Sequence, residues 1–217
     1  MKLFSYFRSG TSHRLRIALR LKGLDPEYVP VDLLHGQHAS ADYRAINPQG
    51  LVPALEVDGE VLIQSPAIIE WLDERYPEPP LLPRDALARA RVRALAAVVG
   101  CDMHPLNNRR VLDYLRSQFA CDDDAVNAWC GTWMSAGFDA LDALLAADDG
   151  RGRFCFGSSP SVADVYLVPQ LSTARRFRIE LARWPRLLDI EAACLELPDF
   201  AEAAPARQPD APAEPAR

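Results

Sequence analysis

The 217-residue sequence lacks the features that define several common protein classes. It has no uninterrupted apolar run near the ~20 residues of a membrane-spanning helix. Its first seven residues lead directly into a charged segment rather than into a secretory signal. Basic residues are also few, with 24 Lys and Arg against 30 Asp and Glu, a net charge of -6. Since phosphate binding needs a basic face, this charge predicts neither a nucleic-acid partner nor an acidic membrane partner. The lack of a membrane span and of a secretory signal predicts a cytoplasmic protein.

The cysteines lack the spacing of a redox motif or of a metal site. There are five, and no two form a Cys-x-x-Cys pair: Cys101, Cys121, Cys130, Cys155 and Cys194. An odd number of widely spaced thiols in a cytoplasmic chain is typical of reduced, structural cysteines. We therefore predict no disulfide, no metal site and no catalytic thiol supplied by the chain itself.

Residues 1–76 alternate between the patterns of strands and helices. The predicted elements, in order, are a strand at 2–7, a helix at 12–22, a strand at 27–33, a short helix at 39–46, a hairpin of strands at 54–57 and 61–63, and a helix through 67–75. Ser65-Pro66 combines a preferred cap residue with proline at the first helical position, which predicts where the last helix begins. The pattern thus predicts a small βαβαββα domain.

A proline cluster separates this domain from a helical remainder. Four prolines lie between residues 77 and 83, a composition that excludes both a helix and a central strand. We predict a linker at 77–85 and an all-helical domain at 86–204, with one long helix at 86–119 interrupted only at Gly100 and Pro105. The last residues, 205–217, carry proline, alanine and charge without an aromatic residue, so we expect a mobile tail without function.

The helical domain has two clear local signatures. Ser161-Val-Ala-Asp164 resembles a capping box that opens a helix. A second helix, at 125–147, repeats apolar residues at helical spacing, and its predicted core face consists of Val126, Trp129, Trp133, Ala136, Ala140 and Leu144. A last helix is predicted at 186–197.

Short motifs in this order make the chain resemble a known family. Residues 8–19 read Arg-Ser-Gly-Thr-Ser-His-Arg-Leu-Arg-Ile-Ala-Leu, which is similar to the signature of zeta-class glutathione transferases. Asn47-Pro48, Val52-Pro53-Ala54-Leu55 and Gln64-Ser65-Pro66 follow in the family's order. The resemblance covers roughly residues 1–200 and implies a thioredoxin-like domain followed by an all-α domain, the glutathione transferase fold. It also implies a homodimer that uses glutathione as its cofactor.

Within this family the chain resembles bacterial maleylpyruvate isomerases most, through His104-Pro-Leu-Asn-Asn108-Arg109-Arg110 and Trp129-Cys-Gly-Thr-Trp133. The resemblance implies glutathione-dependent isomerisation of maleylpyruvate to fumarylpyruvate in gentisate-type degradation of aromatic compounds. The same chemistry on maleylacetoacetate, in tyrosine degradation, is the nearest alternative. A glutathione-conjugating transferase and a non-catalytic binding module are further alternatives, and an intact sulfur site argues against the module.

The resemblance also suggests the residues that bind glutathione. Ser9 stands at the family's leading serine, and Thr11 stands where many members have cysteine, so either hydroxyl is a candidate partner of the sulfur. Alternatively, Thr11 or Ser12 has only a structural role and caps the first helix, and for Ser12 we prefer this interpretation. The other candidate glutathione ligands are His38, Val52 with a cis bond to Pro53, Gln64, Ser65, His104 and Asn108, the last two of which would share one helical face.

A substrate with two carboxylates requires cationic partners, and a planar guanidinium binds a carboxylate through two hydrogen bonds. We predict Arg8, Arg110 and Arg176 for this role, Arg8 also as a catalytic residue with Ser9 and Thr11. Arg109 and Arg175 are interpreted as surface residues, and His13 and His35 as structural or surface residues.

Overall fold

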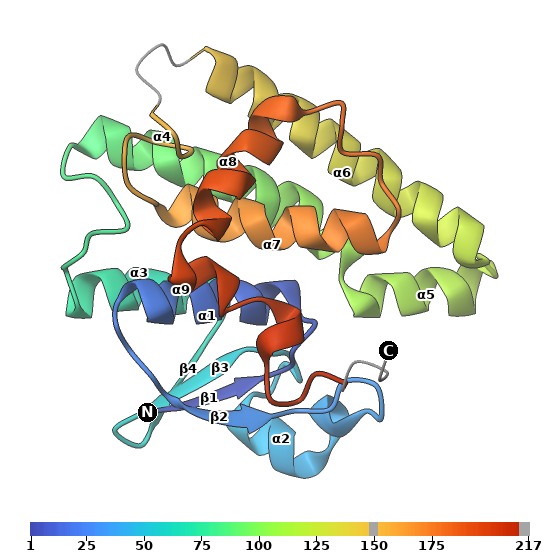
Figure 1. Cartoon of the computed structure of the whole chain (residues 1–217). Helices are drawn as coiled ribbons and strands as arrows, with labels where there is room; N and C mark the ends of the chain where they lie inside the picture. Colours follow the sequence, from blue (N-terminus) through green and yellow to red (C-terminus); the bar gives the residue numbers. More distant parts are fainter. Residues whose placement is uncertain (148–151, 213–217) are drawn as a thin grey trace, which may run out of the picture. The chain divides into compact units, whose positions relative to one another are not determined.

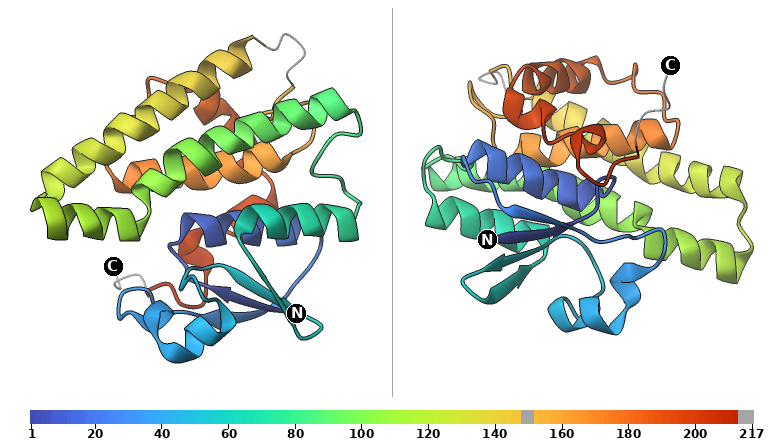
Figure 2. Two further views of the ribbon diagram at one scale, coloured as in Figure 1. Left: turned by 180° about the vertical axis from the view of Figure 1, so that it is seen from behind. Right: turned by 60° about the horizontal axis from the view of Figure 1, so that its bottom comes forward.

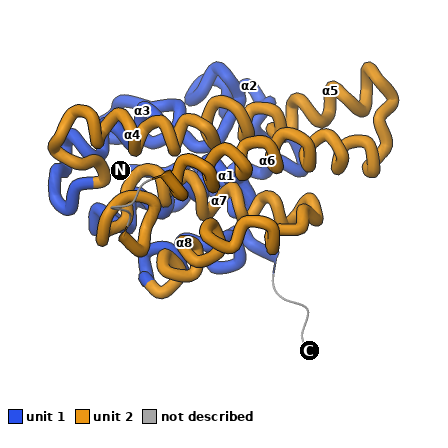
Figure 3. Tube along the Cα trace, turned by 90° about the horizontal axis from the view of Figure 1, so that it is seen from above, with its two compact units in different colours: residues 1–80, 197–217 blue, residues 81–196 orange. Residues whose placement is uncertain are grey.

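The structure, a computed structural model, describes residues 1–147 and 152–212. The chain divides into two compact units, residues 1–80 with 197–217 and residues 81–196 (Figure 3). The first unit contains β1 (Lys2–Ser5), α1 (Gly10–Leu21), β2 (Glu27–Pro30), η1 (Gln37–Ala39), α2 (Ala41–Ile46), β3 (Ala54–Val57), β4 (Glu60–Ile63), α3 (Ser65–Arg75), α9 (Pro198–Ala201) and η4 (Pro205–Arg207). Apart from the last two, this is the predicted βαβαββα order.

The four strands of the first unit form one mixed sheet in the order β2-β1-β3-β4. β1 runs parallel to β2 and antiparallel to β3, and β3 forms a hairpin with β4. Helices α1 and α3 pack together on one face of the sheet (Figure 1). On the other face Phe4 of β1, and Tyr6 just after this strand, form a buried cluster with Tyr43 of α2 and Ala54 of β3. Because successive side chains of a strand point to opposite faces, the sheet is covered on both sides.

The second unit consists of helices. They are α4 (Ala86–Ala97), the π-helical turn η2 (Val98–Met103), the 3-10 turn η3 (His104–Asn107), α5 (Arg109–Phe119), α6 (Asp123–Ala146), α7 (Val162–Arg176) and α8 (Pro185–Leu195). α7 packs against α4 and α8 and is buried along most of its length (Figure 2). In residues 1–147 and 152–212, none of the helices has the length and apolarity required to span a membrane.

The capping box at the start of α7 is confirmed. Both oxygens of the buried Asp164 carboxylate accept hydrogen bonds, Oδ1 from the Cys155 backbone N–H at 2.8 Å and Oδ2 from the backbone N–H and the hydroxyl of Ser161. Through these hydrogen bonds Asp164 fixes both the start of α7 and the loop before it. Burial nevertheless raises the pKa of Asp164.

The segment 86–119 is interrupted where we predicted, since Gly100 lies in η2 and Pro105 in η3, between α4 and α5. Gly100 lies in η2 against Tyr166, where an added Cβ would come within 2.9 Å of the ring. The predicted core face of α6 is confirmed at Val126 but was otherwise wrong. Trp133 and Leu144 are exposed, and the buried residues are Val126, Cys130, Met134, Gly137, Phe138, Leu141 and Leu145. Because α6 carries apolar residues around much of its circumference, its periodicity is compatible with more than one buried face.

The predicted C-terminal boundary also differs from the structure. Residues 197–204 belong to the first unit rather than to the helical one, because α9 packs against α1. The prediction of a mobile tail is wrong for residues 205–212, which include η4 and bind the first unit through Asp210. For residues 213–217 the prediction lies outside the described residues.

Candidate functional site

The loop from β1 to α1 carries three of the predicted residues. Ser9 is the cap residue of α1, with extended backbone, and its Oγ accepts a hydrogen bond from the Ser12 N–H at 3.2 Å. Neither Thr11 nor Ser12 caps this helix, so our preferred interpretation of Ser12 was wrong. The Arg8 side chain is exposed, with its guanidinium carbon 6.0 Å from the centre of the Phe7 ring.

The hydroxyls of Ser9 and Thr11 form a chain that reaches the loop before β3. Thr11 Oγ1 donates to the Val52 carbonyl at 2.9 Å, and the Ser9 and Thr11 oxygens are 2.9 Å apart. A carbonyl oxygen only accepts hydrogen bonds, so the one proton of the Thr11 hydroxyl is used in the bond to Val52. Ser9 must then be the donor of the hydroxyl pair. The structure thus brings Ser9, Thr11 and Val52 together.

The loop before β3 carries the cis Val52–Pro53 bond that we predicted. It is anchored at Leu51, whose carbonyl accepts from Tyr43 Oη and from Asn47 Nδ2, each at 2.7 Å. Predicted His38 lies close to this loop, because its carbonyl oxygen would be 2.8 Å from a Cβ added at Gly50. The backbone of His38 therefore packs against the segment that leads to Val52.

Gln64 and Ser65 form the start of α3. Gln64 occupies the cap position with a φ of +68°, and Ser65 is the first helical residue rather than the cap that we predicted. The Gln64 amide donates to Gln49 Oε1 in the preceding loop. Left-handed backbone outside glycine is sparsely populated and is often found at ligand sites. The free N–H groups of the first turn of α3 are suited to an anion such as a carboxylate.

The start of α1 is also electropositive. Its first turn has no acidic residue, and its N–H groups carry the partial positive charge of the helix dipole. Arg16, on the same helix, is buried and donates to the Phe7 carbonyl at 2.9 Å. Burial lowers its pKa to about 10, which leaves it protonated at neutral pH. This environment favours an anion such as a thiolate over its protonated form.

The remaining predicted residues belong to the second unit. His104 starts η3, whereas Asn108 has extended backbone and caps α5 by accepting from the Arg110 N–H at 3.2 Å. The two do not lie on one continuous helical face, because η3 ends between them; that prediction was wrong. Arg110 is exposed at the start of α5, and Arg176 is exposed at the end of α7, over the Phe177 ring.

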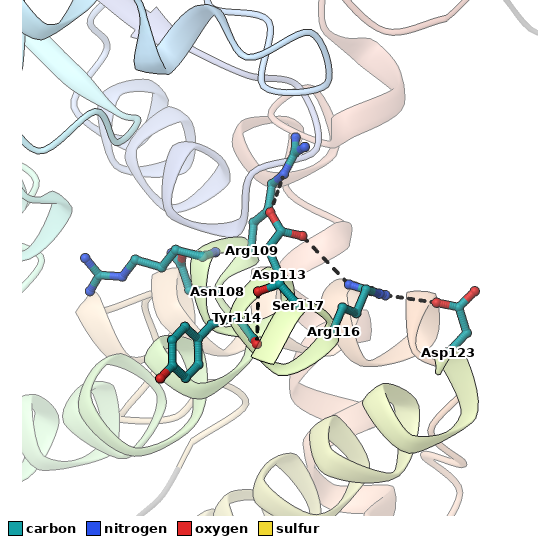
Figure 4. Close-up of polar contacts among 8 residues, drawn as sticks. Asn108, Arg109, Asp113, Tyr114, Arg116, Ser117 and Asp123 are labelled. Atoms are coloured by element: carbon teal, nitrogen blue, oxygen red, sulfur yellow. Dashed lines mark hydrogen bonds and ion pairs between the residues drawn. The ribbon is translucent and has the colours of Figure 1, made fainter. Parts of the chain in front are cut away.

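The two arginines interpreted as surface residues have carboxylate partners. Arg109 binds Asp113 at 3.2 Å, and Asp113 also lies 3.9 Å from Arg116, in a row of charges along α5 (Figure 4). Arg175 donates to both carboxylate oxygens of Glu191 through its two terminal guanidinium nitrogens, Nη1 and Nη2. Sequence reasoning missed Arg16 and Asp210, which hold the loop before Ser9. The position of Arg16 among the apolar residues of its helix could have indicated a buried guanidinium, but nothing in the sequence indicated its partners.

Comparison with known proteins gives concordant results. Residues 8–75 match the model of the glutathione S-transferase N-terminal domain, and residues 123–193 match that of the C-terminal domain. The chain is 61% identical to maleylpyruvate isomerase of a Ralstonia species, over 97% of this chain and 99% of that protein. It is 53% identical to maleylacetoacetate isomerase of Pseudomonas aeruginosa, over 98% of this chain and 100% of that protein.

A solved structure is also similar along the whole chain. It is that of maleylacetoacetate isomerase from Methylobacterium extorquens AM1 with bound malonate and glutathione, with a TM-score of 0.94 and 40% identity. The match covers 98% of this chain and 100% of that one.

Proposed function

Because the chain belongs to the glutathione S-transferase family, we propose that it is a glutathione-dependent cis–trans isomerase that converts maleylpyruvate to fumarylpyruvate. The observation that carries this proposal is the 61% identity, over nearly the whole of both chains, to maleylpyruvate isomerase. Glutathione is the cofactor, since a similar isomerase was solved with glutathione bound.

The reaction requires that the cis double bond lose its π character for a time. The thiolate of glutathione adds to one alkene carbon, and the π electrons move into the conjugated carbonyl as an enolate. Rotation then takes place about a single bond. The enolate re-forms the double bond in the trans geometry and expels the thiolate, so glutathione is regenerated.

For this chemistry we assign the sulfur to the start of α1. Ser9 supplies a hydroxyl donor, Thr11 holds Ser9 in place, and the dipole of α1 stabilises the anion. Each unit by which the thiol pKa falls corresponds to about 1.4 kcal/mol of thiolate stabilisation. We assign the cysteinyl backbone of glutathione to Val52 and its γ-glutamyl carboxylate to Gln64 and Ser65, with His38, His104 and Asn108 as further ligands.

The substrate carboxylates are assigned to Arg8, Arg110 and Arg176. All three are exposed, so a ligand reaches them without desolvating a buried charge. A dicarboxylate, malonate, accompanies glutathione in the similar isomerase of Methylobacterium extorquens AM1. Maleylacetoacetate is the alternative substrate, favoured by the 53% identity to maleylacetoacetate isomerase of Pseudomonas aeruginosa. We also propose that the protein is cytoplasmic and forms a homodimer, as the family resemblance suggests. Light scattering of the purified protein tests the homodimer.

The test is an ultraviolet assay of maleylpyruvate loss by the purified chain, with and without glutathione, beside maleylacetoacetate. We expect catalysis only with glutathione, a higher kcat/KM for maleylpyruvate, and a product that contains no sulfur. Equal rates after removal of all thiol would reject the mechanism. A product that retains the sulfur would show a conjugating transferase instead.

A further inference from the structure

The C-terminal segment, residues 202–212, binds the loop that carries Arg8 and Ser9. Beyond α9 the chain runs through η4 and passes beside the sheet of its own unit, drawn in red (Figure 1). The Asp210 carboxylate accepts from two groups there: Oδ2 from the Phe7 backbone N–H at 2.9 Å, and Oδ1 from the Tyr28 hydroxyl at 2.7 Å. The residue that contacts Phe7 is thus 203 positions away in sequence.

The other side of Phe7 is held by Arg16. Its Nη2 donates to the Phe7 carbonyl at 2.9 Å, and its Nε donates to the Ala203 carbonyl at 3.0 Å. Its Nη1 lies 3.4 Å from both the Tyr6 carbonyl and Ser5 Oγ. Arg16 therefore binds β1, the following loop and the C-terminal segment with one buried guanidinium.

These contacts fix both peptide groups that flank Phe7. Asp210 binds the N–H on one side, and Arg16 binds the C=O on the other. Arg8 and Ser9 follow directly, and the Ser9 N–H itself donates to the Tyr6 carbonyl at 3.0 Å. Because an amide bond is planar, fixing these groups leaves little freedom in the backbone that presents the Ser9 hydroxyl. A carboxylate acceptor makes the Phe7 bond stronger than a neutral one would be.

We propose that Asp210 is a positioning residue of the isomerase, which acts through Phe7 to hold Arg8 and Ser9 where the glutathione sulfur binds. The proposal rests on the proposed function for its kinetic consequences. The rigid attachment matters because a displacement of about 1 Å at a reacting group lowers rates about a hundredfold. The C-terminal segment thus becomes part of the support of the sulfur site, through the contact of Asp210 with Phe7.

The test uses the full chain and removes both acceptor oxygens of Asp210. In Asp210→Ala neither the Phe7 N–H nor the Tyr28 hydroxyl keeps its carboxylate partner. We expect kcat to fall about tenfold or more, with the KM for glutathione changed less. The ultraviolet absorbance of glutathione thiolate on the enzyme should fall in parallel. Glu202→Ala, which removes an exposed carboxylate on the same segment, is the matched control and should behave as wild type.

A second substitution distinguishes positioning from loss of stability. Asp210→Asn keeps one oxygen to accept from the Phe7 N–H, while its NH₂ group donates to the Tyr28 hydroxyl, which can accept as well as donate. We expect Asp210→Asn to retain most of the kcat and thiolate absorbance that Asp210→Ala loses. Wild-type kcat and absorbance in Asp210→Ala, or an equal loss in Asp210→Asn, would overturn the proposal.

The two proposals fail in different ways. Wild-type protein that isomerises neither maleylpyruvate nor maleylacetoacetate would reject the proposed function. The thiolate absorbance requires only glutathione, so it would still test the role of Asp210 in that case.

Discussion

The Ser9 hydroxyl donates to Thr11 Oγ1 across 2.9 Å, because Thr11 directs its own proton to the Val52 carbonyl. The two hydroxyls therefore differ in what they offer a sulfur anion. Ser9 turns its proton to the sulfur by giving up one contact between neutral hydroxyls. Thr11 would have to leave the backbone carbonyl of the neighbouring loop. We infer that Ser9 is the donor to the sulfur and that Thr11 orients it.

Substitutions at these two positions test that difference. We expect Ser9→Ala to raise the pKa of bound glutathione by about one unit or more, and to lower kcat about tenfold to a hundredfold. Thr11→Ala should lower kcat less, and Thr11→Ser should retain both contacts and stay near wild type. The measurements are thiolate absorbance against pH and steady-state kinetics. A larger loss in Thr11→Ala than in Ser9→Ala would assign the sulfur to Thr11.

Substitutions of Arg110 and Arg176, with Arg109 as the control, test whether these arginines bind the substrate carboxylates. Arg110→Ala and Arg176→Ala should each raise the KM for maleylpyruvate about tenfold or more, with the KM for glutathione changed far less, because each removes a carboxylate partner. Arg109→Ala is the control beside Arg110, since Arg109 is already bound to Asp113 (Figure 4). Equal changes in both KM values would exclude a role in substrate binding.

Local signals predicted the elements that shape the sulfur site. Each strand and helix of residues 1–76 shows its own periodicity or turn signal, and the structure has them in that order. The roles of Ser9 and Val52-Pro53 came instead from the resemblance to zeta-class glutathione transferases. Their hydrogen-bond chain was not predicted, because two residues 41 positions apart meet only through the sheet.

What the sequence did not reveal depends on long-range contacts. Composition marked residues 205–217 as a free tail, since few apolar residues are available to bury there. Within the described residues 205–212, the Asp210 carboxylate binds donors at Phe7 and Tyr28 instead. Likewise, Gly100 and Pro105 marked the break between α4 and α5, but nothing in the sequence indicated that Gly100 packs against Tyr166 of α7. No local pattern identifies such partners.

The burial of His13 should make the protein less stable at acid pH. The His13 side chain is buried on α1, and burial, with Arg16 and Arg14 nearby, lowers its pKa from 6.5 to about 3. Between these two values the unfolded chain binds a proton that the folded chain does not. The free energy of unfolding therefore falls as pH falls below 6.5, by at most about 1.4 kcal/mol per pH unit. Above that pH the imidazole is neutral in both states and contributes no slope.

Urea unfolding at several pH values checks this expectation. His13→Phe should reduce the slope between pH 6.5 and 4 by the contribution of one proton, whatever its stability at pH 7. Ser12→Ala changes an equally buried neighbour without removing a titrating group, and should keep the wild-type slope. An unchanged slope in His13→Phe would show that another group takes up the proton.

Asp164 provides the strongest expected effect on stability. Its carboxylate accepts from the Cys155 N–H and from the N–H and hydroxyl of Ser161, all in the buried start of α7. Asp164→Ala leaves these donors without an acceptor, so we expect a loss of about 3–5 kcal/mol and a lower Tm in a thermal scan. Ser161→Ala removes only the capping hydroxyl, which is worth about 1 kcal/mol. Equal losses in the two variants would mean that water replaces the carboxylate, and that α7 does not depend on this buried charge.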